Sequence, residues 1–288
     1  MTHGGPLQVW WGNGIDRGWG GCEPLGVRAF AELVAEGASV PVEGWDFSWF
    51  AGRATEQRPS WGYARLMGER MARAGRALDL QTGGGEVLAG IPKPPAELVA
   101  TEGWPPNAAL ARERLAPLGG TVVEVGEADD LPFPGGSFDL VVSRHPVAVR
   151  WDEVARVLAP AGTYFAQQVG AGSVRELTDF IMGPQPVSQA RDPERARAAA
   201  TEAGLTVVDL RSEALRMEFY DVAAVIVFLR KVIWTVPDFT VDAYLDRLRA
   251  MHDEIEREGP FVAHSQRFLI EARKFEAHMF EAHMAEAR

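Results

Sequence analysis

The residues best suited to chemistry lie where a short apolar run ends in an acid and then meets consecutive glycines. Asp79 lies at the end of the run, glycines occupy positions 83–85, and an apolar segment resumes after Glu86. Glycine permits positive φ and leaves no Cβ between the backbone and a ligand. A helix that starts after such a turn presents unpaired N–H groups and the positive end of its dipole. The stretch therefore predicts a loop that binds an anionic, nucleotide-type cofactor.

The spacing of the glycines narrows the choice of cofactor. A dinucleotide fingerprint would place a third glycine at Leu88, and a Walker loop would continue as Gly-Lys-Ser/Thr; neither is present. The stretch instead resembles the acid-x-Gly-x-Gly-x-Gly signature of class I S-adenosylmethionine (SAM)-dependent methyltransferases. Asp79, Gly83 and Gly85 match its acid and its last two glycines, whereas Gln81 replaces the first glycine. We expect a slightly different turn there, and not a lost site.

A second motif supports the same resemblance. The segments Gly126-Glu127-Ala128-Asp129-Asp130-Leu131-Pro132-Phe133 and Ser137-Phe138-Asp139-Leu140-Val141 are similar to the family's G-D-A-x-x-L-P-F and S-F-D-x-V. Glu127 stands where the family has an aspartate. The resemblance implies that this acid and the next backbone N–H recognise the edge of adenine, and that SAM is the cofactor.

An acid at the end of the next predicted strand completes the cofactor site. Glu102 lies about one β–α unit beyond the glycines, where a carboxylate can accept hydrogen bonds from both ribose hydroxyls. The alternative is a solvated loop acid. Trp104 could cover the adenine face or only the loop. The predicted cofactor-binding residues are Asp79, Gln81, Gly83, Gly85, Glu102, Gly103, Trp104, Glu127, Ala128 and Ser143.

The acceptor side has fewer signals. His145 follows the predicted fourth strand, where the family presents residues to the acceptor, and an imidazole pKa of about 6.5 suits a general base. It could instead hold the start of the next helix. The aromatic residues before the first strand predict either a lid over the substrate or a packing layer. The predicted substrate-pocket residues are Trp49, Trp61, Tyr63 and Arg144.

Composition limits the class of protein. The chain has 288 residues, of which 47% are hydrophobic and 24% are charged, and its net charge is −11. No signal peptide or apolar run of about 20 residues is visible, so we expect a cytoplasmic protein without a membrane partner. The negative charge argues against a nucleic-acid partner. The single cysteine, and the unfavourable spacing of His278 and His283, predict that no metal is bound.

The order of the predicted elements gives the fold. We expect an α/β, Rossmann-like class I methyltransferase fold with a seven-stranded, mainly parallel sheet, an antiparallel last strand and an N-terminal helical cap. Residues 1–74 would form an arm and a cap or lid, and residues 75–288 the methyltransferase domain. The predicted strands include 76–80, 97–102, 121–125, 138–143, 163–169, 205–210 and 261–272. The predicted helices include 27–36, 61–74 with Ser60 as N-cap, 151–158, one after Asp221, and 241–258.

These patterns predict a methyltransferase that moves a methyl group from SAM to a small, aromatic or apolar acceptor by O- or N-methylation. One alternative is an RNA methyltransferase, although no added basic module is visible in the sequence. The other alternative is a SAM-binding module without catalysis, which Gln81 and the absence of an unambiguous base would explain.

Overall fold

The computed structural model describes residues 28–42 and 47–275 and groups the chain into two compact units. Of the described residues, the sheet unit comprises Pro59–Ala171, Ser188–Glu213 and those from Gln266 onward. The helical unit comprises the described residues up to Arg58, with Gly172–Val187 and Ala214–Ser265. The sequence-based boundary between residues 74 and 75 stays a prediction.

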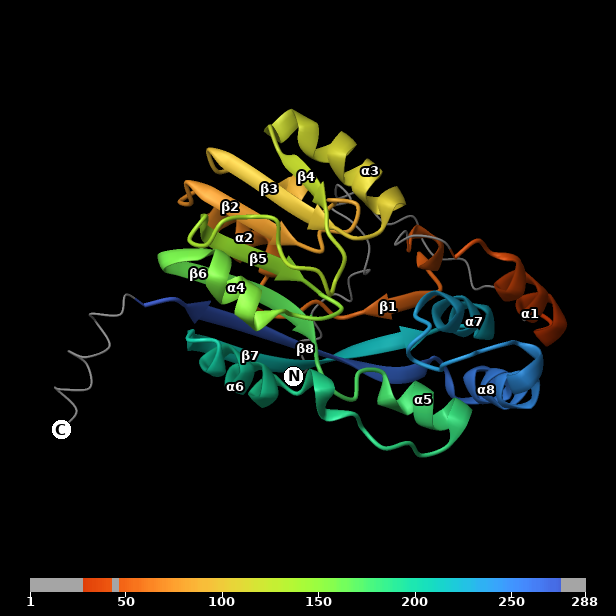
Figure 1. Cartoon of the computed structure of the whole chain (residues 1–288). Coiled ribbons are helices and arrows are strands. Elements are labelled where there is room, and N and C mark those ends of the chain that lie inside the picture. The colour runs from red at the N-terminus through yellow and green to blue at the C-terminus, as the bar shows by residue number, and fades with distance from the viewer. Residues whose placement is uncertain (1–27, 43–46, 276–288) are drawn as a thin grey trace, which may run out of the picture. The chain divides into compact units, whose positions relative to one another are not determined.

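Five parallel strands form the centre of the sheet unit (Figure 1): β2 Arg76–Leu80, β3 Glu97–Glu102, β4 Thr121–Glu124, β5 Phe138–Arg144 and β6 Leu158–Val169. The strand β8, Phe261–Arg273, pairs antiparallel with β6 through its residues 267–273. The full strand order is β1-β7-β8-β6-β5-β2-β3-β4. The predicted Rossmann-like class and the antiparallel last strand are therefore confirmed.

The strand count differs from the prediction by one. Among the described residues the sheet has eight strands, because Ala54–Glu56 forms a three-residue strand, β1, that pairs antiparallel with the end of β7, Thr206–Phe219. The strand β7 is longer than the predicted 205–210, since its later residues alternate polar and apolar side chains. That alternation is typical of a half-buried strand.

Helices cover both faces of the central strands. One core contains Leu140 and Val142 of β5 together with residues of α2, Tyr63–Met71, and α3, Pro105–Leu115. The opposite core contains Val141 and residues of α4, Trp151–Val157, and α6, Pro193–Glu202. Successive residues of β5 thus serve opposite cores, as the period of two in a strand requires. The parallel strands are buried on both faces, which explains their continuous apolar sequences.

The helical unit packs around α7, Val222–Lys231, of which nine of the ten residues are buried. Its other α-helices are α1, Phe30–Ser39, α5, Arg175–Met182, and α8, Leu245–Glu258. Asp221 is the N-cap of α7, because its Oδ1 accepts the N–H of Ala224 at 2.8 Å. This confirms the predicted cap, and such a bond contributes about 1 kcal/mol.

Two local predictions were wrong. Helix α2 starts at Tyr63 after Gly62, which has a φ of 63°, and Ser60 binds Glu213 instead of capping the helix. The short helix expected between the glycine loop and the prolines within 92–95 is also absent, and only a single 3₁₀ turn forms, at Leu88–Gly90. The prolines within 92–95 explain this, since proline lacks an N–H and disfavours helical φ/ψ in the preceding residue.

Candidate cofactor and acceptor site

The glycine loop adopts backbone conformations that explain its composition. Gly83 and Gly85 have φ values of 63° and 79°. A Cβ added to Gly83 would meet no atom within 4 Å, whereas one on Gly85 would lie 3.3 Å from the Cα of Ala111. Gly85 therefore allows α3 to pack closely, and Gly83 leaves open space beside the backbone. Gly83 is the position in the loop where a ligand can approach the main chain.

Gln81 also has a positive φ, 55°, which explains why glycine is common at this position in the family it resembles. A left-handed conformation costs a non-glycine residue roughly 1–2 kcal/mol. Two hydrogen bonds of the Gln81 amide offset that cost: its Oε1 accepts the N–H of Val147, and its Nε2 donates to the carbonyl of Ala148, both at 2.7 Å. The side chain thus connects the end of β2 to the segment after β5.

Asp79 is buried near the end of β2 and accepts a hydrogen bond from Thr82 Oγ1 at 2.7 Å. Loss of hydration raises the pKa of its carboxyl group to about 7, and the negative charge of Glu102 adds to the effect. The Thr82 bond and the positive charge of Arg144 act in the opposite direction. Asp79 is therefore partly protonated near neutral pH.

Glu102 lies beside the glycine loop, as predicted. Its Oε2 accepts the N–H of Gly83 at 2.8 Å, and its Oε1 accepts the N–H of Trp104 at 3.0 Å. The carboxylate is buried, so these two bonds replace hydration that it has lost. Gly103 lies between them, where a Cβ would come within 3.0 Å of the Val125 carbonyl. The ribose-binding role of Glu102 stays a prediction.

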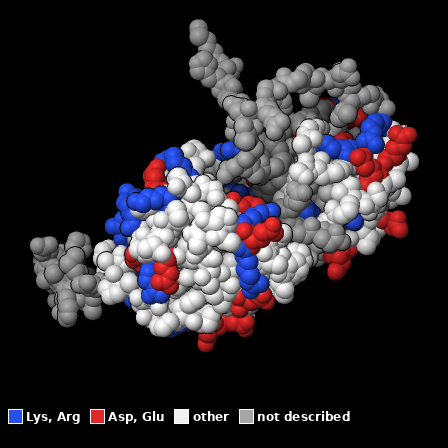
Figure 2. Space-filling view, turned by 90° about the horizontal axis from the view of Figure 1, so that it is seen from above, with Lys and Arg blue, Asp and Glu red and all other residues white. Residues whose placement is uncertain are grey.

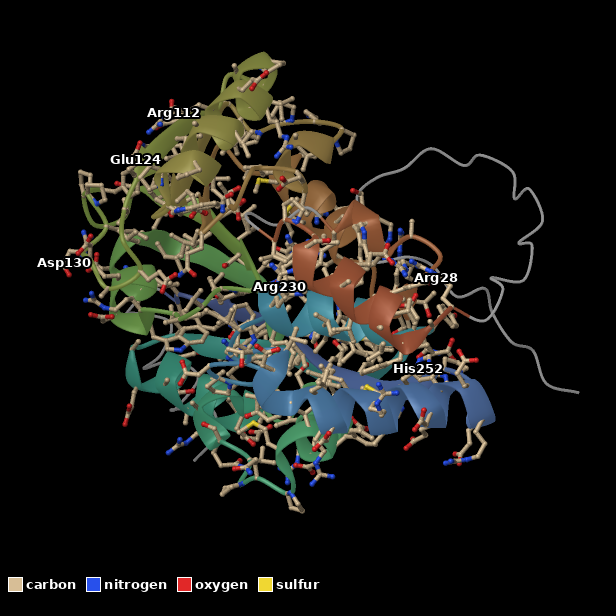
Figure 3. The ribbon with its side chains drawn as sticks, turned by 90° about the vertical axis from the view of Figure 1, so that its right-hand side faces the viewer. Arg28, Arg112, Glu124, Asp130, Arg230 and His252 are labelled. Carbon is tan, nitrogen blue, oxygen red and sulfur yellow. The ribbon has the colours of Figure 1, made fainter. Side chains whose placement is uncertain are left out.

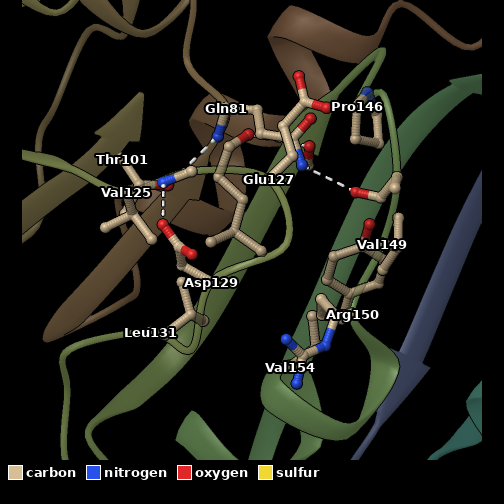
Figure 4. A pocket seen from close by; sticks show the side chains of 15 residues that line it. Gln81, Thr101, Val125, Glu127, Asp129, Leu131, Pro146, Val149, Arg150 and Val154 are labelled. Carbon is tan, nitrogen blue, oxygen red and sulfur yellow. Dashed lines mark hydrogen bonds between the residues drawn. The ribbon is translucent and has the colours of Figure 1, made fainter. Parts of the chain in front are cut away.

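A shallow hollow, open to solvent, lies at the carboxyl ends of β2 and β5 (Figure 4). Three predicted cofactor residues line it: Gln81, Glu127 and Ser143. Ser143 is buried and donates from its hydroxyl to the carbonyl of Leu80 at 3.0 Å, joining the two strands below the hollow.

The residues that hold the loop of the second motif are not among the predicted site residues. Asp129 accepts the N–H of Gly126 at 3.1 Å, and Arg150 donates to the carbonyl of Ala128 at 2.9 Å. Arg150 also pairs with Asp130 and with Asp152. The acidic pair at 129–130 was a visible signal for the first contact. No sequence pattern indicated the contact between Arg150 and Ala128, because the two residues are 22 positions apart in the chain.

Gln167, which is also not among the predicted site residues, connects two residues of the predicted acceptor side, Trp61 and His145. Gln167 of β6 accepts the indole N–H of Trp61 at its Oε1 and donates from Nε2 to Nε2 of His145, both at 2.8 Å. The backbone N–H of His145 donates to the Gln167 carbonyl at 2.7 Å. Burial lowers the pKa of His145 well below its usual value, and the charges of Arg144, Arg267 and Arg191 lower it further.

The remaining predicted pocket residues lie in different surroundings. Tyr63 is buried, donates to the Ser143 carbonyl at 2.9 Å and stacks on Phe165. Trp49 belongs to the helical unit, where the guanidinium of Arg53 lies 4.4 Å from the centre of its ring. Trp61 and Tyr63 are thus placed at the carboxyl ends of β5 and β6. The pocket role of all four predicted residues stays a prediction.

Charges on the surface are mixed. On the face shown in Figure 2, acidic and basic side chains of the described residues alternate in small groups. Figure 3 shows one such pair at the edge of the sheet unit, where Arg112 of α3 lies toward Glu124 of β4, with 2.7 Å between nitrogen and oxygen. Within residues 28–42 and 47–275, no helix is long and apolar enough to cross a membrane, and no three His, Cys, Asp or Glu side chains form a group that could hold a metal ion. His278 and His283 lie outside the described residues.

Comparisons with known proteins agree with this geometry. Residues 78–166 match a family model described as a methyltransferase domain. The YcgJ protein of Bacillus subtilis is 19% identical, with a TM-score of 0.54, and the match covers 75% of this chain and 99% of that one. A candidate methyltransferase from Bacillus halodurans C-125 is 18% identical, with a TM-score of 0.53, over 75% and 100% of the two chains. A protein of unknown function from Deinococcus radiodurans R1 is 16% identical, with a TM-score of 0.50, over 76% and 89%.

The comparison with curated proteins finds no match. The matched range runs from the middle of β2 into β6 and so includes the glycine loop, Glu102, the second motif and Ser143. Residues 78–166 are therefore similar to a methyltransferase domain, and the fold is that of class I methyltransferases.

Proposed function

We propose that this protein transfers a methyl group from SAM to a small acceptor, by O- or N-methylation. The observation that carries the proposal is the arrangement of Asp79, Gly83 and Glu102 at adjoining strand ends, beside a hollow that Glu127 lines. In open α/β sheets ligands bind at the carboxyl ends of the strands, where the strand order reverses. That reversal lies between β2 and β5.

The residues present fit SAM. The open space beside Gly83 admits a ligand to the backbone, and Asp79 and Glu102 offer negative charge to a cofactor that carries a sulfonium and an amino group. Glu127 would accept from the adenine amino group, and the N–H of Ala128 would donate to the adenine ring. When bound, SAM supplies the electrophilic methyl group. The chain's own residues align the acceptor with it and exclude water, and alignment of this kind can lower a barrier by about 7–11 kcal/mol.

On the acceptor side we assign Trp61, Tyr63, Arg144 and His145, which lie in the sheet unit beside the ends of β5 and β6. The buried rings would favour an aromatic or apolar acceptor. A general-base role for His145 stays a prediction. For that role, Nε2 of His145 must give up its hydrogen bond from Gln167 and take a proton from the acceptor. A cytoplasmic location and a pocket role for Trp49 also stay predictions.

Isothermal titration calorimetry with SAM and with S-adenosylhomocysteine tests the cofactor assignment. We expect both to bind. If neither compound binds, the proposal is refuted. Transfer of a labelled methyl group to a panel of small acids, phenols and amines then tests the reaction.

A SAM-binding module without catalysis is the second candidate. Two observations favour it: Gln81 replaces the first glycine, and only a 3₁₀ turn follows the loop. SAM binding without methyl transfer to any member of the panel would support this candidate. An RNA substrate is tested by a gel-shift with transfer RNA at low salt, where tight and salt-sensitive binding would overturn the small-molecule assignment.

A further inference from the structure

The hydrogen bonds around Gln167 determine which nitrogen of His145 carries a proton. The indole N–H of Trp61 can only donate, so the amide oxygen of Gln167 must face it, 2.8 Å away. The amide NH₂ group therefore faces Nε2 of His145, also at 2.8 Å. Because an NH₂ group can only donate, Nε2 must be the acceptor. In the neutral imidazole the proton then lies on Nδ1.

The surroundings hold this arrangement in place. Trp61 and Gln167 are each only 4% exposed, so water does not compete for the amide. The backbone N–H of His145 donates to the Gln167 carbonyl at 2.7 Å, which anchors the histidine to the same residue that its ring contacts. His145 also has a φ of 56°, and non-glycine residues in this region are often found at functional sites.

Three arginines lie around His145. Arg144 precedes it on β5. Arg267 of β8 pairs with Val169, two residues beyond Gln167 on β6, and the residue is 5% exposed. The carbonyl of Arg191 accepts the N–H of Ala171, four residues beyond Gln167. Burial lowers the pKa of His145, and the positive charges of these arginines lower it further, which keeps the imidazole neutral at physiological pH.

A neutral imidazole with this arrangement is a poor general base. The lone pair of Nε2 is engaged by Gln167, and Nδ1 carries the proton. The surrounding arginines oppose a second proton on the ring. The same arginines favour any negative charge placed beside them. An acceptor that reaches this end of the sheet as an anion would need no base.

We propose that the acceptor is a small carboxylate, which is methylated on oxygen, and that Gln167 is a positioning residue that holds His145 in the Nδ1–H form. This inference rests on the proposed function and specifies its acceptor. A carboxylate oxygen forms a bond to the methyl carbon, the carbon–sulfur bond breaks, and its electron pair stays on sulfur. The product is a methyl ester, and no proton leaves the acceptor.

The first test reads the tautomer directly. Nitrogen-15 NMR of protein labelled at histidine distinguishes Nδ1–H from Nε2–H, and His145→Gln identifies the His145 signals. We expect Nδ1–H in the wild type. Gln167→Glu can accept but not donate, so it should convert His145 to Nε2–H and raise its pKa. Gln168→Glu adds the same charge at the next residue and should leave the tautomer unchanged. Nε2–H in the wild type would overturn the inference, whether or not the variants fold.

The second test uses benzoate as the anionic probe and benzamide as its uncharged counterpart. Benzoate should move the His145 resonances with a dissociation constant at least tenfold lower than that of benzamide. Arg191→Gln and Arg144→Gln should each reduce this preference, whereas Arg112→Gln, at the far edge of the sheet, should not. Equal binding of the two probes would overturn the inference. Neither test needs SAM, so a failure of SAM binding in calorimetry would refute the proposed function separately.

Discussion

Replacement of Asp79 by asparagine should change how stability depends on pH. The carboxyl group has an ordinary pKa near 3.8 and a pKa of about 7 in the folded protein. Below pH 4 the group is protonated in both the folded and the unfolded state, so stability does not depend on its ionisation there. Between pH 4 and 7 the unfolded chain releases the proton and the folded chain keeps it. Stability contributed by protonated Asp79 is therefore lost as the pH rises through this window.

The magnitude follows from the two pKa values. A difference of about three pH units corresponds to about 4 kcal/mol, and this is an upper limit because the folded protein can relax around the charge. Asparagine keeps an oxygen that can accept the Thr82 hydroxyl and cannot ionise. The variant should match the wild type at pH 4 and exceed its stability at pH 8 by up to about 4 kcal/mol.

Urea unfolding monitored by tryptophan fluorescence between pH 4 and 8 measures this difference. Asp253→Asn, at an exposed position on α8, is the matched control and should give a constant difference across the range. A constant difference for Asp79→Asn as well would refute the reasoning, since it would show that the carboxyl group titrates normally.

Binding of SAM should show the reciprocal effect. A cationic cofactor beside Asp79 favours the ionised carboxylate, so the affinity of the wild type should rise with pH up to about 7, by at most tenfold per pH unit. The affinity of Asp79→Asn should be lower at pH 7.5 and nearly independent of pH. Calorimetry at pH 5.5, 6.5 and 7.5 measures both. A wild-type affinity that does not change with pH would contradict a contact between Asp79 and the cationic part of SAM.

Three further predictions concern the loops of the site. Glu102→Ala should weaken SAM binding by on the order of tenfold or more, because the N–H groups of Gly83 and Trp104 lose a charged acceptor, and an unchanged dissociation constant in calorimetry would exclude Glu102 as a ligand. Gln81→Gly should speed amide hydrogen exchange at Val147, because the N–H of Val147 loses its acceptor. Global stability should change by less than about 1 kcal/mol, because relief of the left-handed conformation offsets the lost bonds. Unaltered exchange at Val147 would contradict the contact. Arg150→Ala should increase exchange at residues 126–130, whose loop it binds through the Ala128 carbonyl, with Arg211→Ala as an exposed control; equal exchange in both variants would show that Arg150 does not hold the loop.

The sequence alone was sufficient to predict the fold and the resemblance to methyltransferases. The patterns that predict them are local: Asp79, the glycines at 83–85 and the motif from Gly126 to Val141. Each pattern depends on the backbone conformation of only a few neighbouring residues. The end of β3 at Glu102 and the N-cap Asp221 were predictable for the same reason. The prolines within 92–95 predicted an early end to the helix after the glycine loop, and the structure has only a 3₁₀ turn there.

Only the tertiary structure decided the contacts of the site, because they join residues that are distant in the chain. Gln81 binds residues 147 and 148. Gln167 connects Trp61 to His145, and Trp61 and Gln167 are 106 positions apart in the chain. The pKa values of Asp79 and His145 likewise depend on burial and on charges brought together by folding. A sequence pattern records the periodicity of single elements. The pairing of strands β2, β5 and β6 determines which side chains meet at their ends.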